Sequence, residues 1–464
     1  MTESITLLPA VTLLAKFAAK ELSPVEVTRA ALDRIERLNG RYNAFCLVDA
    51  EQAMVAATES ERRWMRGEPK GLLDGVPSSI KDLVLTKDWP TGWGSKAILR
   101  IPPPDVDAPC VARLREHGAV LLGKTTSPEF GWKGVTDSPR TGITRNPWNR
   151  DLTPGGSSGG AAVAAALGMG AVHVGSDGGG SIRIPAAFSG IFGFKPSFGR
   201  VPTFPASVYG TLSHVGPMTR CVADAVLMLN VLAEPDSRDW FSLPYEAIDF
   251  GQGLEDGIAG LRIAYSPDLG FGGVEAEVAA RVIEAAEAFH GLGARVETVD
   301  LDLTEARQIF RIHWYAGAAA LLRGLSADQH DRIDPGLREV ATEGEKYDLA
   351  TYLDAVKARA LLGQKMKEFH CRYDLLLTPS LPITAFAVGT EVADAAHQER
   401  WFDWTPFSYP FNLTQQPAAS MPCGLTGDGL PVGVQLVGPM HSDGLVLRAC
   451  RAYESRHPIS LPKV

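Results

Sequence analysis

The chain has 464 residues, enough for one large α/β domain or two smaller ones. Apolar residues make up 45% and charged residues 21%, which is typical of a globular protein. The net charge of −9 and the lack of a long basic run argue against nucleic acid or an anionic membrane surface as the main partner.

The N-terminal stretch MTESITLLPAVTLLAKFAAK has an acidic residue at position 3 and does not resemble a signal peptide. The most apolar run, residues 161–175, is too short and too interrupted by glycine to span a bilayer. Six cysteines lie far apart with no CxxC pair, which favours reduced thiols over a disulfide frame or a zinc site. We therefore expect a cytoplasmic protein.

Two helices are predicted near the N-terminus. The first begins with Ser23 as the N-cap and Pro24 at the first helical position, and Glu26 completes a capping box. Apolar residues then recur at helical spacing, and Gly40 is the predicted end of this helix. Residues 50–66 form the second predicted helix.

Strands alternate with helices in the rest of the chain. Residues 109–125 predict a helix followed by the short buried strand AVLLG, and the stretches GLRIAYSPD and ARVETVDL are predicted strands on either side of a helix at 276–291. Such alternation is typical of a layered α/β fold. We expect a single domain over 1–464, with helical additions around 305–365 and a lid or pocket segment, acidic and then aromatic, at 387–408.

Two short motifs suggest a serine hydrolase but are weak individually. GGSSG at 155–159 matches the G-x-S-x-G elbow around Ser157, but the residues before it are polar and broken by proline, where an elbow needs a buried strand. SSIK at 78–81 matches S-x-x-K, but the S-D-N and K-T-G companions of that motif are incomplete.

The stretch GSDGGGSIRIP at 175–185 places three glycines directly before Ser181. A glycine run costs backbone entropy on folding, so it indicates an unusual backbone path or a close approach. The loop is either a phosphate cradle or a set of backbone N–H donors for an oxyanion beside a nucleophilic serine. The first alternative is weaker because no G-K-[ST] follows. The candidate oxyanion donors are Gly178, Gly179 and Gly180, together with the N–H of Ser181.

Taken together, GGSSGG at 155–160, SDGGGSIR at 176–183 and VPSSIKD at 76–82 resemble the amidase signature family. The resemblance extends through GKTTSPEFG, FGFKPSFGRVP, NLTQQPAASMPCG and GLPVGVQLVGP, and it covers roughly residues 20–455. It implies a mixed β-sheet flanked by helices on both faces, with the site at the loop edge of the sheet. One departure is Gly178, where the family more often has threonine or isoleucine, so we expect a looser loop.

The resemblance also implies a mechanism. Ser181 would attack the substrate carbonyl, Ser157 would relay the proton, and Lys81 would receive it, with no metal or organic cofactor. The lysine must then be uncharged, and burial can lower a lysine pKa by several units from its ordinary value of about 10.4. The family further implies a cis peptide bond between Gly156 and Ser157.

Other residues are assigned supporting roles. Ser158, Asp177 and Arg183 are expected to organise the loops, and His173, in a strand-like run, is expected to be structural. Four aromatic side chains are candidates for an apolar substrate pocket: Phe130, Trp132, Tyr209 and Trp314.

We therefore expect an enzyme that hydrolyses a small-molecule amide, and also esters or carbamates, through an acyl-enzyme on Ser181. Nucleic acid and membranes are not expected partners, and a homodimer is compatible with the sequence. Two alternatives remain open. The first alternative to an amidase is the glutamine-hydrolysing subunit of a tRNA-dependent amidotransferase, which the acidic charge balance disfavours. The second is a catalytically silent scaffold, which the presence of all three catalytic candidates disfavours.

Overall fold

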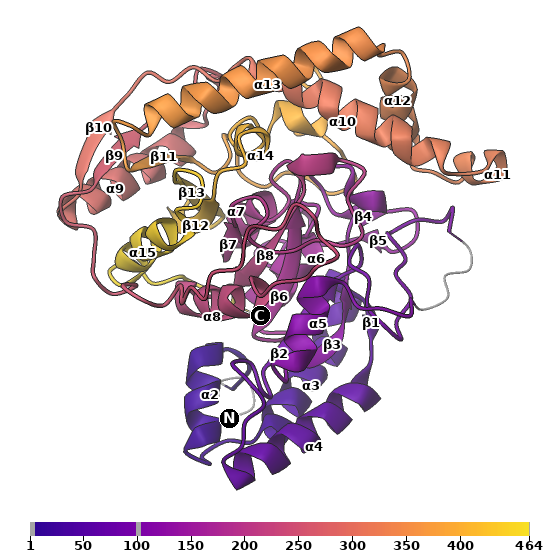
Figure 1. Ribbon diagram of the computed structural model, residues 1–464, viewed down its shortest axis with the longest axis vertical. Coiled ribbons are helices and arrows are strands. Elements are labelled where there is room, and N and C mark those ends of the chain that lie inside the picture. Colours follow the sequence, from indigo (N-terminus) through magenta and orange to yellow (C-terminus); the bar gives the residue numbers. More distant parts are fainter. Residues whose placement is uncertain (1–4, 99–103, 464) are drawn as a thin grey trace.

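The computed structural model describes residues 5–98 and 104–463. Its centre is one eleven-stranded mixed sheet, flanked by helices as the sequence predicts (Figure 1). The strands are β1 (Phe45–Val48), β2 (Pro77–Lys81), β3 (Val120–Thr125), β4 (Asp137–Ser138), β5 (Gly142–Ile143), β6 (Val172–Asp177), β7 (Phe192–Lys195), β8 (His214–Thr219), β9 (Arg262–Tyr265), β10 (Arg295–Thr298), β11 (Leu375–Pro379), β12 (Ala418–Leu425) and β13 (Pro431–Val437).

The order across the large sheet is β1-β3-β2-β6-β8-β7-β12-β13-β11-β9-β10, and β4 pairs with β5 separately. Because strands from both ends of the chain share one sheet, we interpret the chain as one domain. The helices are α2 (Ala10–Ala18), α3 (Pro24–Tyr42), α4 (Ala50–Arg66), α5 (Pro109–Glu116), α6 (Gly159–Ala166), α7 (Arg183–Ser189), α8 (Val222–Leu232), α9 (Ala276–Gly291), α10 (Ala306–Arg323), α11 (Ala327–His330), α12 (Pro335–Gly344), α13 (Leu349–Phe369), α14 (Pro410–Leu413) and α15 (Asp443–Glu454), with short 3-10 turns at Glu129–Gly131, Gly210–Leu212 and Trp401–Asp403.

Helix α3 begins where the sequence predicts but ends later than predicted. Ser23 and Glu26 form the predicted capping box of α3. The helix continues past Gly40, however, and ends at Asn43, which has a left-handed φ of 52°. The Asn43 side chain donates hydrogen bonds to the carbonyls of Thr141 and Ile143, so distant contacts stabilise this ending.

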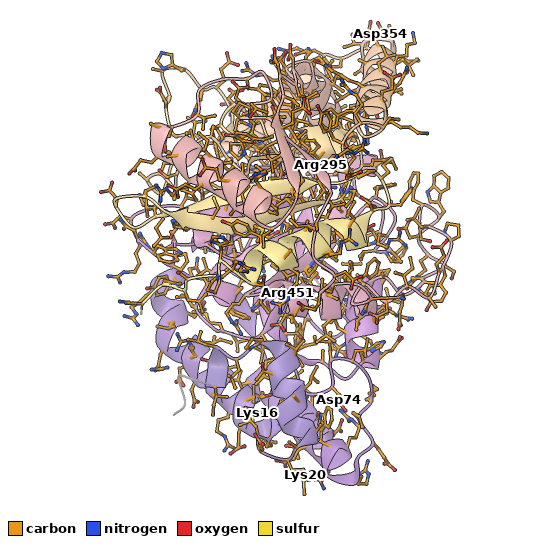
Figure 2. All side chains as sticks on the ribbon, turned by 90° about the vertical axis from the view of Figure 1, so that its left-hand side faces the viewer. Lys16, Lys20, Asp74, Arg295, Asp354 and Arg451 are labelled. Carbon is orange, nitrogen blue, oxygen red and sulfur yellow. The ribbon has the colours of Figure 1, made fainter. Side chains whose placement is uncertain are left out.

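The helical additions lie at one end of the molecule. Helices α10, α12 and α13 lie together at the end opposite α2, α3 and α4 (Figure 1). Figure 2 shows the same arrangement from the side, with Asp354 of α13 at one end of the long axis and Lys16 and Lys20 at the other. No helix in the described part of the chain combines the length and the apolarity that crossing a membrane requires.

The aromatic half of segment 387–408 belongs to the core. Trp401, Trp404 and Phe407 are fully buried, and Trp401 packs edge-on against Phe310 of α10. None of these residues lines the pocket described below. The expectation of a pocket segment here is therefore wrong, because these rings fill the space between the sheet and the helical layer.

Two neighbouring parallel strands position the site. β2 pairs in parallel with β6, with Ile80 opposite Val174. The carboxyl ends of parallel strands meet at the same edge of a sheet, so Lys81 at the end of β2 and Asp177 at the end of β6 lie at one edge.

Helix α6 brings the serine loop to this edge of the sheet. Its sequence is GGAAVAAA, so every residue except one valine is glycine or alanine, and all of them are buried. A Cβ on Gly160 would lie 2.5 Å from the carbonyl oxygen of Ala44, so only glycine permits this close approach.

Candidate active site

Lys81 lies at the centre of a cluster of hydroxyl groups. Its Nζ is 2.7 Å from Ser157 Oγ, 2.8 Å from Ser158 Oγ and 3.0 Å from Ser176 Oγ. The lysine side chain has no exposed surface. The sequence motifs at 76–82, 155–160 and 176–183 therefore meet at one point in space.

The hydrogen bonds of Ser158 determine how Lys81 is oriented. Ser158 Oγ donates its proton to the carbonyl of Ser176 at 3.1 Å and accepts the Ser176 N–H at 3.2 Å. A serine hydroxyl has one proton to donate, so toward Ser158 the lysine acts as the donor. This leaves Ser157 as a hydroxyl that can donate to the lone pair of an uncharged Lys81.

Burial lowers the pKa of Lys81 well below its ordinary value. The negative charge of Asp177 opposes this effect, but that carboxylate is neutralised by Arg183, 2.9 Å away. The adjacent Asp82 does not contact Lys81. Its carboxylate accepts the N–H of Gly92 and lies 3.8 Å from Lys124 Nζ, as expected for a side chain on the opposite side of an extended strand.

Ser157 and Ser181 line the same pocket. The peptide bond between Gly156 and Ser157 is cis, the geometry that the resemblance implies. The Ser158 N–H donates to the Ser181 carbonyl at 3.1 Å and so connects the two loops. Among the hydrogen bonds of the described residues, none directly joins the Ser157 and Ser181 hydroxyls.

Asp177 and Arg183 form a buried ion pair beneath the glycine loop. Arg183 Nε and Nη2 donate to the two carboxylate oxygens at 3.0 and 2.9 Å, and both side chains are fully buried. Burial alone would raise the pKa of Asp177, but the charge and hydrogen bonds of Arg183 hold it below the ordinary value. The expected organising role of both residues agrees with this geometry.

The backbone N–H groups of the glycine loop differ in their partners. Gly180 N–H donates to Asp177 Oδ1 at 2.8 Å, so it is already engaged inside the loop. Among the hydrogen bonds of the described residues, none uses the N–H of Gly178, Gly179 or Ser181. The expectation that Gly180 is an oxyanion donor is therefore corrected. Its φ is +127° and a Cβ there would clash with Ser408, so the loop can adopt this backbone conformation only with glycine at position 180.

The glycine at position 178 leaves room for an aromatic ring. A Cβ on Gly178 would lie 3.1 Å from Cζ3 of Trp314, so the ring of Trp314 occupies the space that a larger side chain would need. The tryptophan in turn stacks on Tyr209, with ring centroids 3.8 Å apart and planes 9° from parallel.

The pocket has a volume of about 220 Å³ and an apolar lining. Phe130, Tyr209 and Trp314 line it as predicted, and Trp93 stacks on Phe130 with centroids 6.5 Å apart. Among the described lining residues, none is Asp, Glu, Lys, Arg or His. The lining outside the catalytic loops consists mainly of Leu83, Val84, Leu85, Trp93, Ala108, Pro109, Cys110, Phe130, Val208, Tyr209, Val215, Trp314, Leu321 and the segment 202–207.

Trp132 was wrongly expected in this pocket. It is 1% exposed and belongs to the core, where its carbonyl accepts a hydrogen bond from Trp314 Nε1 at 3.0 Å. Trp132 therefore supports Trp314 from behind. His173 is also buried away from the pocket, with Nδ1 2.7 Å from Ser79 Oγ, and burial lowers its pKa to about 3, so it is structural as expected.

Three residues of the site were missed by sequence reasoning. Ser176 contacts Lys81 and lines the pocket. Asn412 donates to Asp177 Oδ1 at 2.8 Å, and Ser408 Oγ donates to the Gly179 carbonyl at 2.6 Å. Ser176 begins the SDGGGSIR motif and could have been given a role, but nothing local indicates residues more than 200 positions away. No group of three or more His, Cys, Asp or Glu side chains among residues 5–98 and 104–463 is placed to hold a metal ion.

Comparison with known proteins supports the same class. The family model described as Amidase matches residues 26–447. An acylamidase of Rhodococcus erythropolis is 37% identical over 97% of this chain and 96% of its own length. One of the subunits of the glutamyl-tRNA(Gln) amidotransferase of Myxococcus xanthus is 36% identical, covering 96% of each chain. The crystal structure of a bacterial aryl acylamidase of the amidase signature family superposes with a TM-score of 0.90 at 31% identity, over 97% of this chain and 96% of that one.

The fold and the site therefore define a hydrolase acting on C–N bonds other than peptide bonds. The chain belongs to the amidase signature family.

Proposed function

We propose that this protein hydrolyses neutral, largely apolar carboxylic amides through an acyl-enzyme on Ser181. The observation that carries the proposal is the contact between the buried Lys81 Nζ and Ser157 Oγ, at the wall of an apolar pocket that also contains Ser181. Esters and carbamates present the same kind of carbonyl beside a leaving group and are proposed as further substrates.

The proposed proton transfers follow from the hydrogen bonds of Lys81. Ser181 Oγ attacks the carbonyl carbon while its proton passes to Ser157 Oγ and the Ser157 proton passes to Lys81 Nζ. The proton then returns by the same route to the leaving nitrogen as the C–N bond breaks. A water molecule attacks the resulting ester and is activated in the same way, which releases the acid and restores Ser181. The hydroxyl contact between Ser157 and Ser181 is expected to close when substrate is bound, as is common for catalytic hydrogen bonds.

The oxyanion donors that we propose are the N–H groups of Gly178, Gly179 and Ser181. They have no other partner among the described residues, and the ion pair of Asp177 and Arg183 holds the loop that carries them. One donor of this kind is worth about 2.7–4 kcal/mol of transition-state stabilisation.

The pocket lining supports aryl or alkyl amides as the substrate class. Two stacked aromatic pairs, Trp93 with Phe130 and Tyr209 with Trp314, contribute flat apolar surface to a volume of about 220 Å³. A charged substrate would lose its hydration there without gaining a partner from the described lining, and such burial is costly.

The similarity to amidotransferase subunits supports glutamine hydrolysis as a second candidate. Glutamine carries an ammonium and a carboxylate, and the described lining of the pocket offers no charged side chain for either group. We therefore favour the amidase. A cytoplasmic location is also proposed, supported by six free cysteines.

A hydrolysis screen tests this proposal. Anilides, primary amides, esters and carbamates are compared with free glutamine, using wild type and Ser181→Ala. We expect turnover of apolar anilides or amides that is lost in the variant. Turnover of glutamine alone, and only with a partner subunit, would favour the amidotransferase. Failure of a fluorophosphonate to label Ser181, with no turnover of any substrate, would favour the silent scaffold.

A further inference from the structure

A second cavity shares no lining residue with the catalytic pocket. It has a volume of about 700 Å³, within the range typical of small-molecule sites. Its lining comes from helix α13, which lies on the outside of the molecule (Figure 1), and from the segments 413–416 and 439–441. We call it the α13 groove, and its lining is Val356, Arg359, Ala360, Gly363, Gln364, Met366, Lys367, His370, Cys371, Leu413, Thr414, Gln415, Gln416, Pro439, Met440 and His441.

Helix α13 keeps open space along the groove. Val356, Ala360, Gly363 and Lys367 are spaced at i, i+4, i+7 and i+11, so they share one face of the helix. Gly363 is in the interior of this 21-residue helix, and a Cβ there would meet no atom within 4 Å. Glycine in a helix interior is less favourable than alanine, because it loses more backbone freedom on folding. No atom in the described part of the chain fills the space beside this glycine, so the groove stays open here.

The groove contains cations without carboxylates. Arg359 and Lys367 line it, and none of the described lining residues is Asp or Glu, although the chain carries a net charge of −9. Arg359 donates to the Leu413 carbonyl at 2.7 Å and to Thr211 Oγ1 at 2.8 Å, with longer contacts to the Thr211 and Asn412 carbonyls at 3.3 and 3.5 Å. All of these acceptors are neutral. Arg359 is half-buried, and a charge withdrawn from water is normally paired with an opposite charge. Among the residues that the structure describes, the guanidinium therefore lacks the anion that would neutralise it.

His370 also lines the groove and is neutral. His370 Nδ1 donates to the carbonyl of Tyr373 at 3.0 Å, and His370 Nε2 accepts a hydrogen bond from Gln416 Nε2 at 2.8 Å. Burial lowers the pKa of His370 to about 4, so this ring adds no charge near neutral pH.

The opposite wall has an unusual backbone. Gln415 and His441 have φ angles of 64° and 68°, a left-handed conformation that non-glycine residues rarely adopt. Residues of this kind concentrate at binding and catalytic sites, where surrounding structure holds them. Both line the groove, on the side facing α13.

We propose that the α13 groove binds a small apolar monocarboxylate, aliphatic or aryl, with its carboxylate at Lys367 and its apolar body along the face of α13 that includes Gly363. The size of the cavity, its apolar lining and its cations select this class. The acid released from an apolar amide belongs to the same class, and this last point alone rests on the proposed function.

Calorimetric titration with octanoate and 4-phenylbutyrate tests the proposal, with 1-octanol as the uncharged control. We expect one carboxylate to bind per chain outside the catalytic pocket, and 1-octanol to bind more weakly. Gly363→Ala should bind as wild type does, and Gly363→Trp, which fills the groove, should lose binding. Lys367→Gln should weaken binding by up to about fivefold, the range for an exposed ion pair.

Several results would overturn the proposal. They are an absence of binding by both carboxylates, equal binding by 1-octanol, and undiminished binding by both Gly363→Trp and Lys367→Gln. A change from dimer to monomer in Gly363→Trp, measured by light scattering, would instead assign the groove to a contact between subunits. The anilide assay is run on the same samples, so a loss of the proposed catalytic function is recognised separately from a loss of binding.

Discussion

Replacing Lys81 with methionine should make the protein more stable, and the gain should depend on pH. The side chain is fully buried, and burial lowers its pKa well below the ordinary value. Methionine fills a similar volume without a nitrogen. The substitution also removes the proposed base, so hydrolysis of amides should be lost even at moderately alkaline pH.

The sign and size of the pH effect follow from proton linkage. Between the lowered pKa of folded Lys81 and the ordinary pKa of about 10.4, the unfolded chain binds a proton that the folded chain does not. The free energy of unfolding of the wild type therefore rises with pH in this window, by about 1.4 kcal/mol per pH unit. Lys81→Met lacks this dependence, so its advantage should shrink at this slope as the pH rises through the window.

Urea unfolding followed by circular dichroism at several pH values measures this difference. Lys367→Met is the matched control, because Lys367 is exposed and should show no such change. A stability difference between wild type and Lys81→Met that stays constant from pH 7 to pH 9 would mean that folded Lys81 is charged there. The proposed base would then be wrong.

Three further predictions concern the loops and the pocket. Ser157→Ala should lower kcat by about 10²–10⁴-fold with little change in KM, measured with an anilide, because it interrupts the proton relay; a variant with near-normal kcat would contradict this role. Gly180→Ala should lower the free energy of unfolding by about 1–3 kcal/mol, measured in urea, because its φ is +127°. Trp314→Ala should raise KM for an anilide, whereas Trp132→Ala should cost about 3–5 kcal/mol of stability and leave KM nearly unchanged; the reverse pattern would place the wrong tryptophan in the pocket.

The sequence predicted the parts of the site whose signal is local. Lys81, Ser157 and Ser181 belong to three short motifs, and the order of strands and helices around them follows from hydrophobic periodicity. The capping box at Ser23 is similarly local, and the structure contains it. The end of that helix at Asn43 could not be predicted, because hydrogen bonds to residues about 100 positions away stabilise it.

The remaining errors have a common physical cause. Trp132 and Trp314 are equally apolar, and only the fold decides which ring faces the pocket and which fills the core. The sequence predicted the N–H of Gly180 as an oxyanion donor, but this N–H donates a hydrogen bond to the carboxylate of Asp177. Asn412 is chemically apt for the same carboxylate, yet 235 positions separate the two residues.

Trapping the acyl-enzyme tests the central claim most directly. The protein is mixed with a p-nitrophenyl ester of an apolar acid, quenched in acid within the first turnover, and digested. The acylated peptide is then fragmented by mass spectrometry to locate the modified serine. The account predicts the mass of the acyl group on the peptide that contains Ser181, and none on that peptide in Ser181→Ala. An acyl group on Ser157 or Ser158 instead, or steady turnover with no acylated peptide, would contradict it.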